Sequence, residues 1–277
     1  MAVAAVGHPY DRYAEAYRDW WGPILASSAV GLLDRLDGLV AVDRSIDLVD
    51  VGTGTGSLLI AALERWPMAR ATGVDPSARM MDVGEASAQE RGPALRSRAR
   101  FLIGSAGDLP LADASVDLVV SSFAIQLAPS RAAAVREAVR VLRPGGHFAC
   151  ITWQAGGDPF EPDDIVDRVL DELDVMPPPG GPEPHVYASP ETAAAELRRA
   201  GFRRVTARTE WLAHQFTPES YVAVLEHWIE DDLFTSLSPR RRNRLRDRLL
   251  VELRLIPVDD LLWRRPLVSV VGEAPHP

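Results

Sequence analysis

Three glycines, Gly52, Gly54 and Gly56, alternate with threonines in the stretch DLVDVGTGTGSLLIAALERW, which covers residues 47–66. Because glycine has no Cβ, a cluster of this kind lets the backbone approach a ligand closely. An apolar run precedes the glycines and a helical pattern follows them, and the N-terminus of a helix favours negatively charged groups. These residues predict a ligand site for a nucleotide phosphate, a dinucleotide or another cofactor.

Two of these ligand classes require residues that the chain lacks. A phosphate-binding P-loop needs a lysine after its last glycine, but the sequence contains no lysine, and all 30 of its basic residues are arginine. The dinucleotide fingerprint Gly-x-Gly-x-x-Gly places its third glycine at position 57, where the chain has Ser57. The P-loop is therefore excluded, and the glycine spacing weighs against NAD.

The composition narrows the class of partner. The chain has 277 residues, of which 47% are hydrophobic, and a net charge of -9, whereas nucleic-acid binders normally carry a basic surface. The single Cys150 lies in an apolar run, which predicts an inert buried thiol and no multi-cysteine metal site. The N-terminus has no signal-peptide pattern, and no apolar stretch reaches the length of about 18 residues that a membrane span needs. We expect a cytoplasmic protein, monomeric or homodimeric, without bound metal or nucleic acid.

The glycines must be held by a larger architecture, and the chain alternates short apolar runs with helical patterns. This alternation predicts an α/β fold with a doubly wound, seven-stranded, mostly parallel sheet. Ligands of such sheets bind at the carboxyl ends of the strands. Four polar or glycine positions follow predicted strands and are expected to line one crevice: Gly52, Asp75, Ser105 and Ser121.

The pattern changes after residue 155. The stretch MPPPGGPEPHVYASPE, residues 176–191, is rich in proline and glycine and predicts a loop that acts as a lid. Three later helices are predicted to begin at a hydroxyl residue followed by proline, at Ser189, Thr217 and Ser238. We therefore divide the chain into an N-terminal helical lid (1–45), a cofactor-binding core (46–155), a segment with the lid loop, a helix and the sixth strand (156–216), a helical insertion (217–256) and a final strand (257–277).

The run VDVGTGTGSL resembles the first motif of the class I methyltransferases that depend on S-adenosylmethionine (SAM). Three further stretches follow in the order and at the spacing of that family's later motifs: GVDPS with Asp75, FLIGSAGDLPLADASVDLVVSSFAIQL, and VREAVRVLRPGGHFACITW. The resemblance covers roughly residues 10–155 and, more loosely, the last two strands. It implies a Rossmann-like methyltransferase fold with SAM as cofactor and S-adenosylhomocysteine as product.

The resemblance also implies which residues contact SAM. The glycines approach its methionine part, and Asp75 is placed to accept from the two ribose hydroxyls; a turn-capping role for Asp75 is the alternative. The full set of expected cofactor residues is Tyr17, Gly52, Thr53, Gly54, Gly56, Asp75, Pro76, Met80, Ser105, Ala106, Ser121 and Gln126. Ser105 departs from the family, which usually has an acidic residue at this adenine-contacting position, so Asp108 is a substitute candidate.

The acceptor side is less defined by motifs. Residues 10–21 resemble the family's N-terminal lid, and with the insertion they suggest a substrate pocket of Tyr10, Tyr13, Trp20 and Tyr221. A general base is optional in methyl transfer from a sulfonium, because positioning can remove much of the barrier. His227 and His185 are the candidate bases, with His214 as a further possibility, because histidine titrates near neutral pH.

The leading hypothesis is a SAM-dependent methyltransferase that acts on a small, partly apolar metabolite through an oxygen, nitrogen or carbon acceptor. The segment SSFAI stands where methyltransferases of base amino groups have an Asp/Asn-Pro-Pro-Phe/Tyr motif, which disfavours a nucleic-acid substrate. Two alternatives remain: a catalytically silent SAM-binding regulatory protein and an NAD(P)-dependent oxidoreductase.

Overall fold

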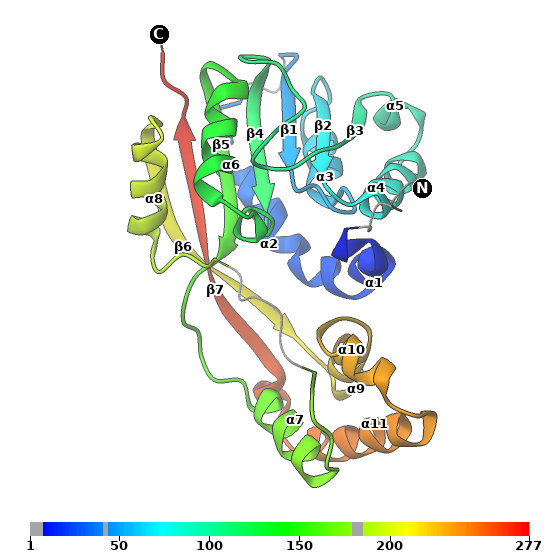
Figure 1. The fold of residues 1–277 in the computed structure, drawn as a ribbon. Coiled ribbons are helices and arrows are strands. Elements are labelled where there is room, and N and C mark those ends of the chain that lie inside the picture. The colour runs from blue at the N-terminus through cyan, green and yellow to red at the C-terminus, as the bar shows by residue number, and fades with distance from the viewer. Residues whose placement is uncertain (1–7, 41–43, 179–184, 277) are drawn as a thin grey trace, which may run out of the picture.

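The structure, a computed structural model, describes residues 8–40, 44–178 and 185–276. Seven strands form one sheet in the order β3-β2-β1-β4-β5-β7-β6. The first five are parallel to one another, and β7 runs antiparallel to both β5 and β6 (Figure 1). The strand bounds are β1 Asp47–Val51, β2 Arg70–Asp75, β3 Ala99–Ile103, β4 Val116–Ser122, β5 Leu142–Trp153, β6 Arg203–Gln215 and β7 Leu262–Glu273. The predicted seven-stranded, mostly parallel α/β fold is confirmed.

Helices cover both faces of the sheet. Successive side chains of β1, β4 and β5 point to opposite faces, so they belong alternately to two apolar clusters. Leu48, Leu118 and Ile151 pack with α2 and α3 in one cluster, whereas Val49, Val119 and Cys150 pack with α6 and α8 in the other. The helices of the core are η1 Pro9–Tyr13, α1 Ala14–Ala16, η2 Tyr17–Trp21, α2 Gly22–Asp34, α3 Ser57–Arg65, α4 Ala78–Glu90, α5 Pro93–Arg96, η3 Ile125–Leu127, α6 Arg131–Val141 and α8 Pro190–Arg199.

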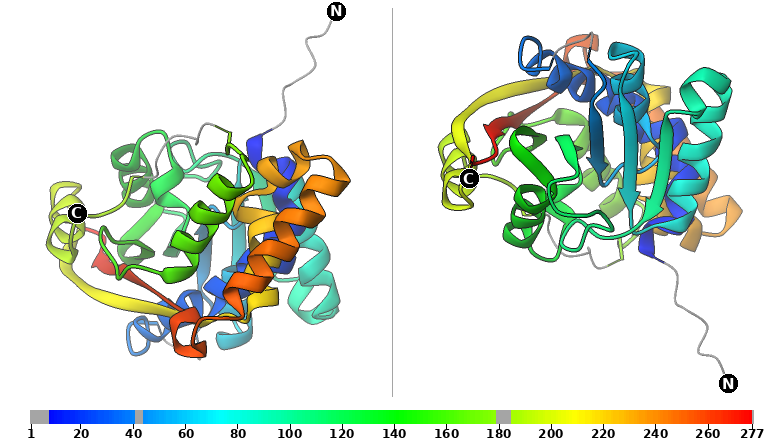
Figure 2. Two further views of the ribbon diagram at one scale, coloured as in Figure 1. Left: turned by 90° about the horizontal axis from the view of Figure 1, so that it is seen from below. Right: turned by 90° about the horizontal axis from the view of Figure 1, so that it is seen from above.

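The antiparallel pair β6 and β7 extends beyond the other strands and carries the insertion at its far end (Figures 1 and 2). Helices α9 Pro218–Val224, η4 Leu225–Ile229, α10 Asp231–Ser236, α11 Pro239–Leu253 and η5 Val258–Leu261 lie between these two strands. Ser189, Thr217 and Ser238 are N-caps of α8, α9 and α11, each followed by proline, as predicted. The insertion therefore lies beyond the carboxyl ends of the parallel strands, on the side where α1 packs.

Helix α7, Glu161–Glu172, differs from the prediction, which had only a loop between the fifth strand and Ser189. Its buried residues Ile165, Val166, Val169 and Leu170 follow a helical period, and it packs against α11 of the insertion. The apolar stripe is short and lies directly before the proline-rich stretch, whose composition predicts a loop. Part of the predicted lid loop, residues 179–184, lies outside the described residues.

Strand β5 begins at Leu142, directly after α6, and includes the run Pro144-Gly145-Gly146. Proline and glycine are typical of turns, so the sequence predicts a break between helix and strand at this run, and the structure differs from that prediction. The pairing of β4 with β5 shifts register between Val116 and Leu118, which absorbs this irregular stretch.

The described ranges, 8–40, 44–178 and 185–276, contain neither a candidate membrane span nor a candidate metal cluster. No helix there combines the length and the apolar character that crossing a bilayer would require. No group of three or more His, Cys, Asp or Glu side chains there is arranged to hold a metal ion.

Candidate functional site

The glycine loop joins β1 to α3 and uses a backbone conformation that favours glycine. Gly52, Gly54 and Gly56 have φ angles of 71°, 53° and 82°. A Cβ at Gly52 would lie 2.1 Å from the Cβ of Ala124, so a side chain there would collide with the loop after β4. At Gly54, by contrast, no described atom lies within 4 Å of the Cβ position. The loop is thus tightly packed at its start and open at its centre.

Asp50 is the unusual residue of this loop, because it is a carboxylate that is only 1% exposed at the end of a central strand. Its Oδ2 accepts a hydrogen bond of 2.7 Å from the Thr53 hydroxyl. Its Oδ1 is buried and has no hydrogen-bond partner among the described residues. Burial raises the pKa of Asp50 to about 7, and the nearby Asp75 carboxylate adds to this rise. A buried acceptor without a donor indicates a place for a cationic or donor group of a ligand.

Asp75 ends β2, as the sequence predicted, and its carboxylate lies beside the glycine loop. Its Oδ2 accepts from the Gly54 backbone N–H at 3.0 Å, and its Oδ1 accepts from the Ser77 N–H at 2.9 Å. Burial raises its pKa despite these two hydrogen bonds. Each carboxylate oxygen can accept more than one hydrogen bond, so both oxygens keep capacity for ligand donors. The turn-capping and ligand-binding roles of Asp75 are therefore compatible.

The N-terminal segment, residues 8–21, packs against the start of α4 next to Asp75. Asp11 accepts a hydrogen bond of 2.6 Å from the Ser77 hydroxyl, and Glu15 pairs with Arg79. Tyr10 and Tyr17 pack against Met80, Val83 and Ala14. The pKa of Tyr17 is raised by burial and by the proximity of Tyr10, Asp50 and Asp75. The segment thus brings two tyrosines to the two buried carboxylates.

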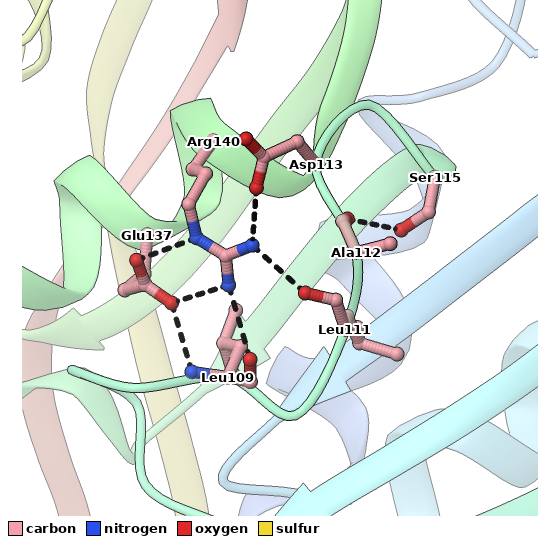
Figure 3. Close-up of polar contacts among 7 residues, drawn as sticks. All are labelled: Leu109, Leu111, Ala112, Asp113, Ser115, Glu137 and Arg140. Atoms are coloured by element: carbon pink, nitrogen blue, oxygen red, sulfur yellow. Dashed lines mark hydrogen bonds and ion pairs between the residues drawn. The ribbon is translucent and has the colours of Figure 1, made fainter.

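Arg140 of α6 fixes the loop between β3 and β4, which contains the predicted adenine-contacting residues (Figure 3). It donates to the carbonyl oxygens of Leu109 at 3.0 Å and Leu111 at 2.8 Å, and to Asp113 at 2.7 Å. Glu137 holds Arg140 and also accepts from the Leu109 N–H at 2.9 Å.

The predicted adenine-contacting residues precede Leu109 in the same loop, and they differ in exposure. Ser105 and Asp108 are exposed, whereas Ala106 is half-buried. Pro76, expected on the cofactor's ribose side, is also exposed.

Ser121 and Gln126 connect strands with their side chains. Ser121 lies within β4, rather than after it as predicted, and donates to the Val51 carbonyl at 2.8 Å. Gln126 donates to the Phe123 carbonyl at 2.6 Å and accepts from Thr152 at 2.6 Å. Phe123, between them, has a φ of 51°, a conformation that is rare for aromatic residues and is found at ligand sites.

An aromatic cluster lies between the N-terminal segment, the ends of β5 and β7, and the insertion. We call Tyr10, Tyr13, Tyr17, Trp21, Trp153, Trp228 and Trp263 the aromatic cluster; all are partly buried. The centroid of the Trp228 ring lies 5.3 Å from Tyr17 and 6.1 Å from Trp21. Trp153 lies 6.0 Å from Trp263 and 4.8 Å from the strained Phe123. The cluster extends from the crevice side of the N-terminal segment to the insertion.

The predicted substrate-pocket residues occupy different places. Tyr10 and Tyr13 belong to the aromatic cluster. Trp20 stacks on His227 at 4.8 Å, and both are exposed. Tyr221 is 2% exposed, and its hydroxyl donates to Asp163 of α7 at 2.7 Å. Its contacts with Phe160 and Phe216 make it part of the packing that joins α7 to α9.

The candidate bases are spread over the molecule. His185 lines a cavity of about 630 Å³ between α6 and α8. Its backbone N–H donates to the Gln126 carbonyl. His214 lies on β6 against Phe216, and burial lowers its pKa. His227 is exposed in the insertion beside Trp20. The structure does not bring these histidines together.

Four residues around the site were missed by sequence reasoning. Asp50 had a visible signal, because a charged residue inside a buried parallel strand is unusual. Asp11 and Arg140 contact residues that are distant in sequence, which local patterns do not report. Trp228 has the spacing of an apolar stripe on its own helix, which predicts packing within the insertion. Its partners in the N-terminal segment could not be found from periodicity.

The sheet order, the glycine loop after β1 and the acidic residue at the end of β2 are those of a Rossmann-like methyltransferase. The model of a methyltransferase domain family matches residues 49–150. The ubiquinone/menaquinone biosynthesis C-methyltransferase UbiE of Bradyrhizobium diazoefficiens is 33% identical over 183 residues, covering 60% of this chain and 70% of that protein. UbiE of Rubrivivax gelatinosus is 48% identical over 119 residues, which is 42% of this chain and less than half, 43%, of that protein. The chain belongs to the class I SAM-dependent methyltransferases.

Solved structures share the fold at lower identity. The YcgJ protein of Bacillus subtilis aligns with a TM-score of 0.59 and 20% identity, over 91% of this chain and all of that one. The [4+2]-cyclase SpnF aligns with a TM-score of 0.58 and 19% identity over the full length of both chains. These likenesses concern the fold alone.

Proposed function

We propose that this protein transfers a methyl group from SAM to a small molecule with a flat, largely apolar ring. The observation that carries the proposal is the buried Asp50, whose Oδ1 has no partner in the described part of the chain. The proposed cofactor site is the glycine loop together with Asp50, Asp75 and the N-terminal segment, and the proposed acceptor side is the aromatic cluster with residues 217–256.

The residues around the glycine loop fit the chemical groups of SAM. The ammonium of its methionine part suits the orphan oxygen of Asp50, because a charge-assisted hydrogen bond satisfies both groups. The open space above Gly54 admits ligand atoms where a side chain would stand. The N-terminus of α3, which follows directly, favours the methionine carboxylate. Asp75 supplies acceptors for the ribose hydroxyls.

When bound, SAM supplies a methyl group on a positively charged sulfur with a neutral leaving group. The chain's own contribution is to orient and to exclude water. Tyr17 lies near Asp50 and Asp75 and presents an aromatic ring, whose face attracts a cation. Holding acceptor and methyl donor in line can supply on the order of 7–11 kcal/mol of barrier reduction. His227 and His185 stay candidates for a base that would take a proton from the acceptor.

Two observations support a flat, apolar acceptor. Tryptophan and tyrosine rings bind planar ligands by offset stacking, and the aromatic cluster offers several partly buried rings beyond the N-terminal segment. The relatives UbiE of Bradyrhizobium diazoefficiens and of Rubrivivax gelatinosus are C-methyltransferases of ubiquinone/menaquinone biosynthesis by name. An electron-rich ring, such as a hydroquinone, is therefore the first acceptor class to test. A cytoplasmic location and a monomeric or homodimeric state stay predictions.

The test has two parts. Calorimetry with S-adenosylhomocysteine and with NADH should show binding of the first and none of the second; the reverse would refute the cofactor assignment. Purified protein with SAM and a panel of hydroquinones, phenols, amines and carboxylic acids should then release S-adenosylhomocysteine with the ring compounds. Tight binding without turnover on any of them would instead support a SAM-binding regulatory protein.

A further inference from the structure

The N-terminal segment is held from two sides. On the inner side, Asp11 bonds to Ser77 and Glu15 pairs with Arg79, both at the start of α4. On the outer side, Arg12 pairs with Asp232 of the insertion at 2.6 Å, on the surface. Exposed pairs of this kind stabilise little. The stronger outer contact must therefore come from the rings.

Trp228 is the centre of that outer contact. Its ring lies 5.3 Å from Tyr17, 5.7 Å from Tyr13, 6.3 Å from Tyr10 and 6.1 Å from Trp21. One insertion residue thus contacts four rings of the N-terminal segment. Tyr17 is one of these rings, and its pKa is raised by the proximity of Asp50 and Asp75, the two buried carboxylates of the proposed cofactor site.

Both sides of this contact are π-helical turns. In η2 the Gly22 N–H bonds to the Tyr17 carbonyl, and in η4 the Glu230 N–H bonds to the Leu225 carbonyl at 2.7 Å. Such turns are rare and are frequent at functional sites. The extra residue rotates the side chains that follow it. Gly22 also leaves room for the Tyr17 ring, since a Cβ there would lie 3.3 Å from it. The local geometry of both segments thus serves the meeting of Tyr17 and Trp228.

We propose that Trp228 is a positioning residue for the cofactor: by packing on Tyr17 and Trp21 it keeps the N-terminal segment closed over the glycine loop. The insertion therefore sets the affinity for SAM, although it lies far from every cofactor motif in sequence. This inference rests on the proposed function, because it assumes that SAM binds beside Asp50 and Asp75.

The experiment compares cofactor affinity with stability in the full-length protein. Trp228→Ala, Trp228→Phe and the control Trp211→Ala are titrated with S-adenosylhomocysteine by calorimetry, and each apo protein is melted. Trp211 is a suitable control because it is 50% exposed on β6 and contacts Arg264 instead of the N-terminal segment. We expect Trp228→Ala to bind about tenfold more weakly, the order of loss when a preorganised wall is released. The phenylalanine variant should restore most of the affinity, and the control should match the wild type.

If Trp228 has a purely structural role, Trp228→Ala should melt at a lower temperature but bind S-adenosylhomocysteine as tightly as the wild type below the melting transition. That result would overturn the inference. If the alanine variant does not fold, Trp228→Leu is held to the same comparison. A double-mutant cycle with Tyr17→Ala adds a second criterion. The two substitutions should be strongly non-additive for affinity, and additive effects would also overturn the inference. If the wild type does not bind S-adenosylhomocysteine at all, the proposed function is refuted instead.

Discussion

Replacing Asp50 by asparagine should have opposite effects on stability and on cofactor affinity. The native pKa of Asp50, about 7, lies above its ordinary value of 3.8 because the carboxyl is buried. The folded state therefore binds the proton more tightly than the unfolded state. The resulting stabilisation is fully present below pH 3.8 and is lost as the pH rises through 7. An asparagine at this position stays neutral and avoids that loss.

The magnitude follows from the shift. Between pH 5 and pH 7 the wild type loses about 1.4 kcal/mol per pH unit relative to the asparagine variant, or about 3 kcal/mol in all. From about one pH unit above the native pKa, the difference stays constant. The new amide NH₂ takes the place of the unpartnered Oδ1 and costs about 1–3 kcal/mol at every pH. This constant cost cancels when the two pH values are compared.

Urea unfolding of both apo proteins at pH 5 and pH 8 measures the effect. The stability advantage of Asp50→Asn over the wild type should grow by about 3 kcal/mol between the two conditions. Asp47→Asn in the same strand is the control, because its carboxylate is 43% exposed. If the difference in unfolding free energy between Asp50→Asn and the wild type is equal at pH 5 and pH 8, the raised pKa of Asp50 is refuted.

Cofactor affinity should move the other way. At pH 8 the ionised Asp50 is the proposed partner of the methionine ammonium, and a hydrogen bond to a charged group contributes about 1.5–3 kcal/mol. Asp50→Asn should therefore bind S-adenosylhomocysteine about 10- to 100-fold more weakly by calorimetry. If the variant is more stable at pH 8 but binds as tightly as the wild type, the buried charge is confirmed and its role toward the ammonium is refuted.

Three further predictions concern separate parts of the site. Asp75→Ala should lose most affinity for S-adenosylhomocysteine while circular dichroism shows the fold retained; unchanged affinity would remove Asp75 from the ribose. Arg140→Met should free the loop that Arg140 anchors through the carbonyl oxygens of Leu109 and Leu111. We expect faster hydrogen exchange in residues 105–115 and weaker adenosine binding, and unaltered exchange would contradict this. Cys150 is buried, which raises the pKa of its thiol to about 12, so a thiol reagent should react with it only after unfolding; reaction of the native protein would contradict the burial.

The fold was predictable because its signals are local. Alternating apolar runs and helical patterns identify the strands and helices up to β5, and Ser189, Thr217 and Ser238 begin helices because capping depends on adjacent residues. Asp75 could be placed for the same reason, since it ends an apolar run. Helix α7 was missed because its short stripe precedes a proline-rich stretch. The contact between Trp228 and Tyr17 joins residues that are far apart in the chain, and no periodicity within either helix reports it.

Asp50 shows what structure adds to a motif. In the sequence it is a single charged residue within an apolar run. Because its charged form is buried, it destabilises the folded apo protein at neutral pH. A buried carboxylate without a donor is a poor structural choice, whereas beside the open backbone of Gly54 it suits a cationic ligand group. Asp75 lies close enough to raise its pKa further, so the two carboxylates repel each other until a positive charge binds between or beside them. A ligand that carries both a sulfonium and an ammonium relieves this repulsion, and its binding should release protons near pH 7.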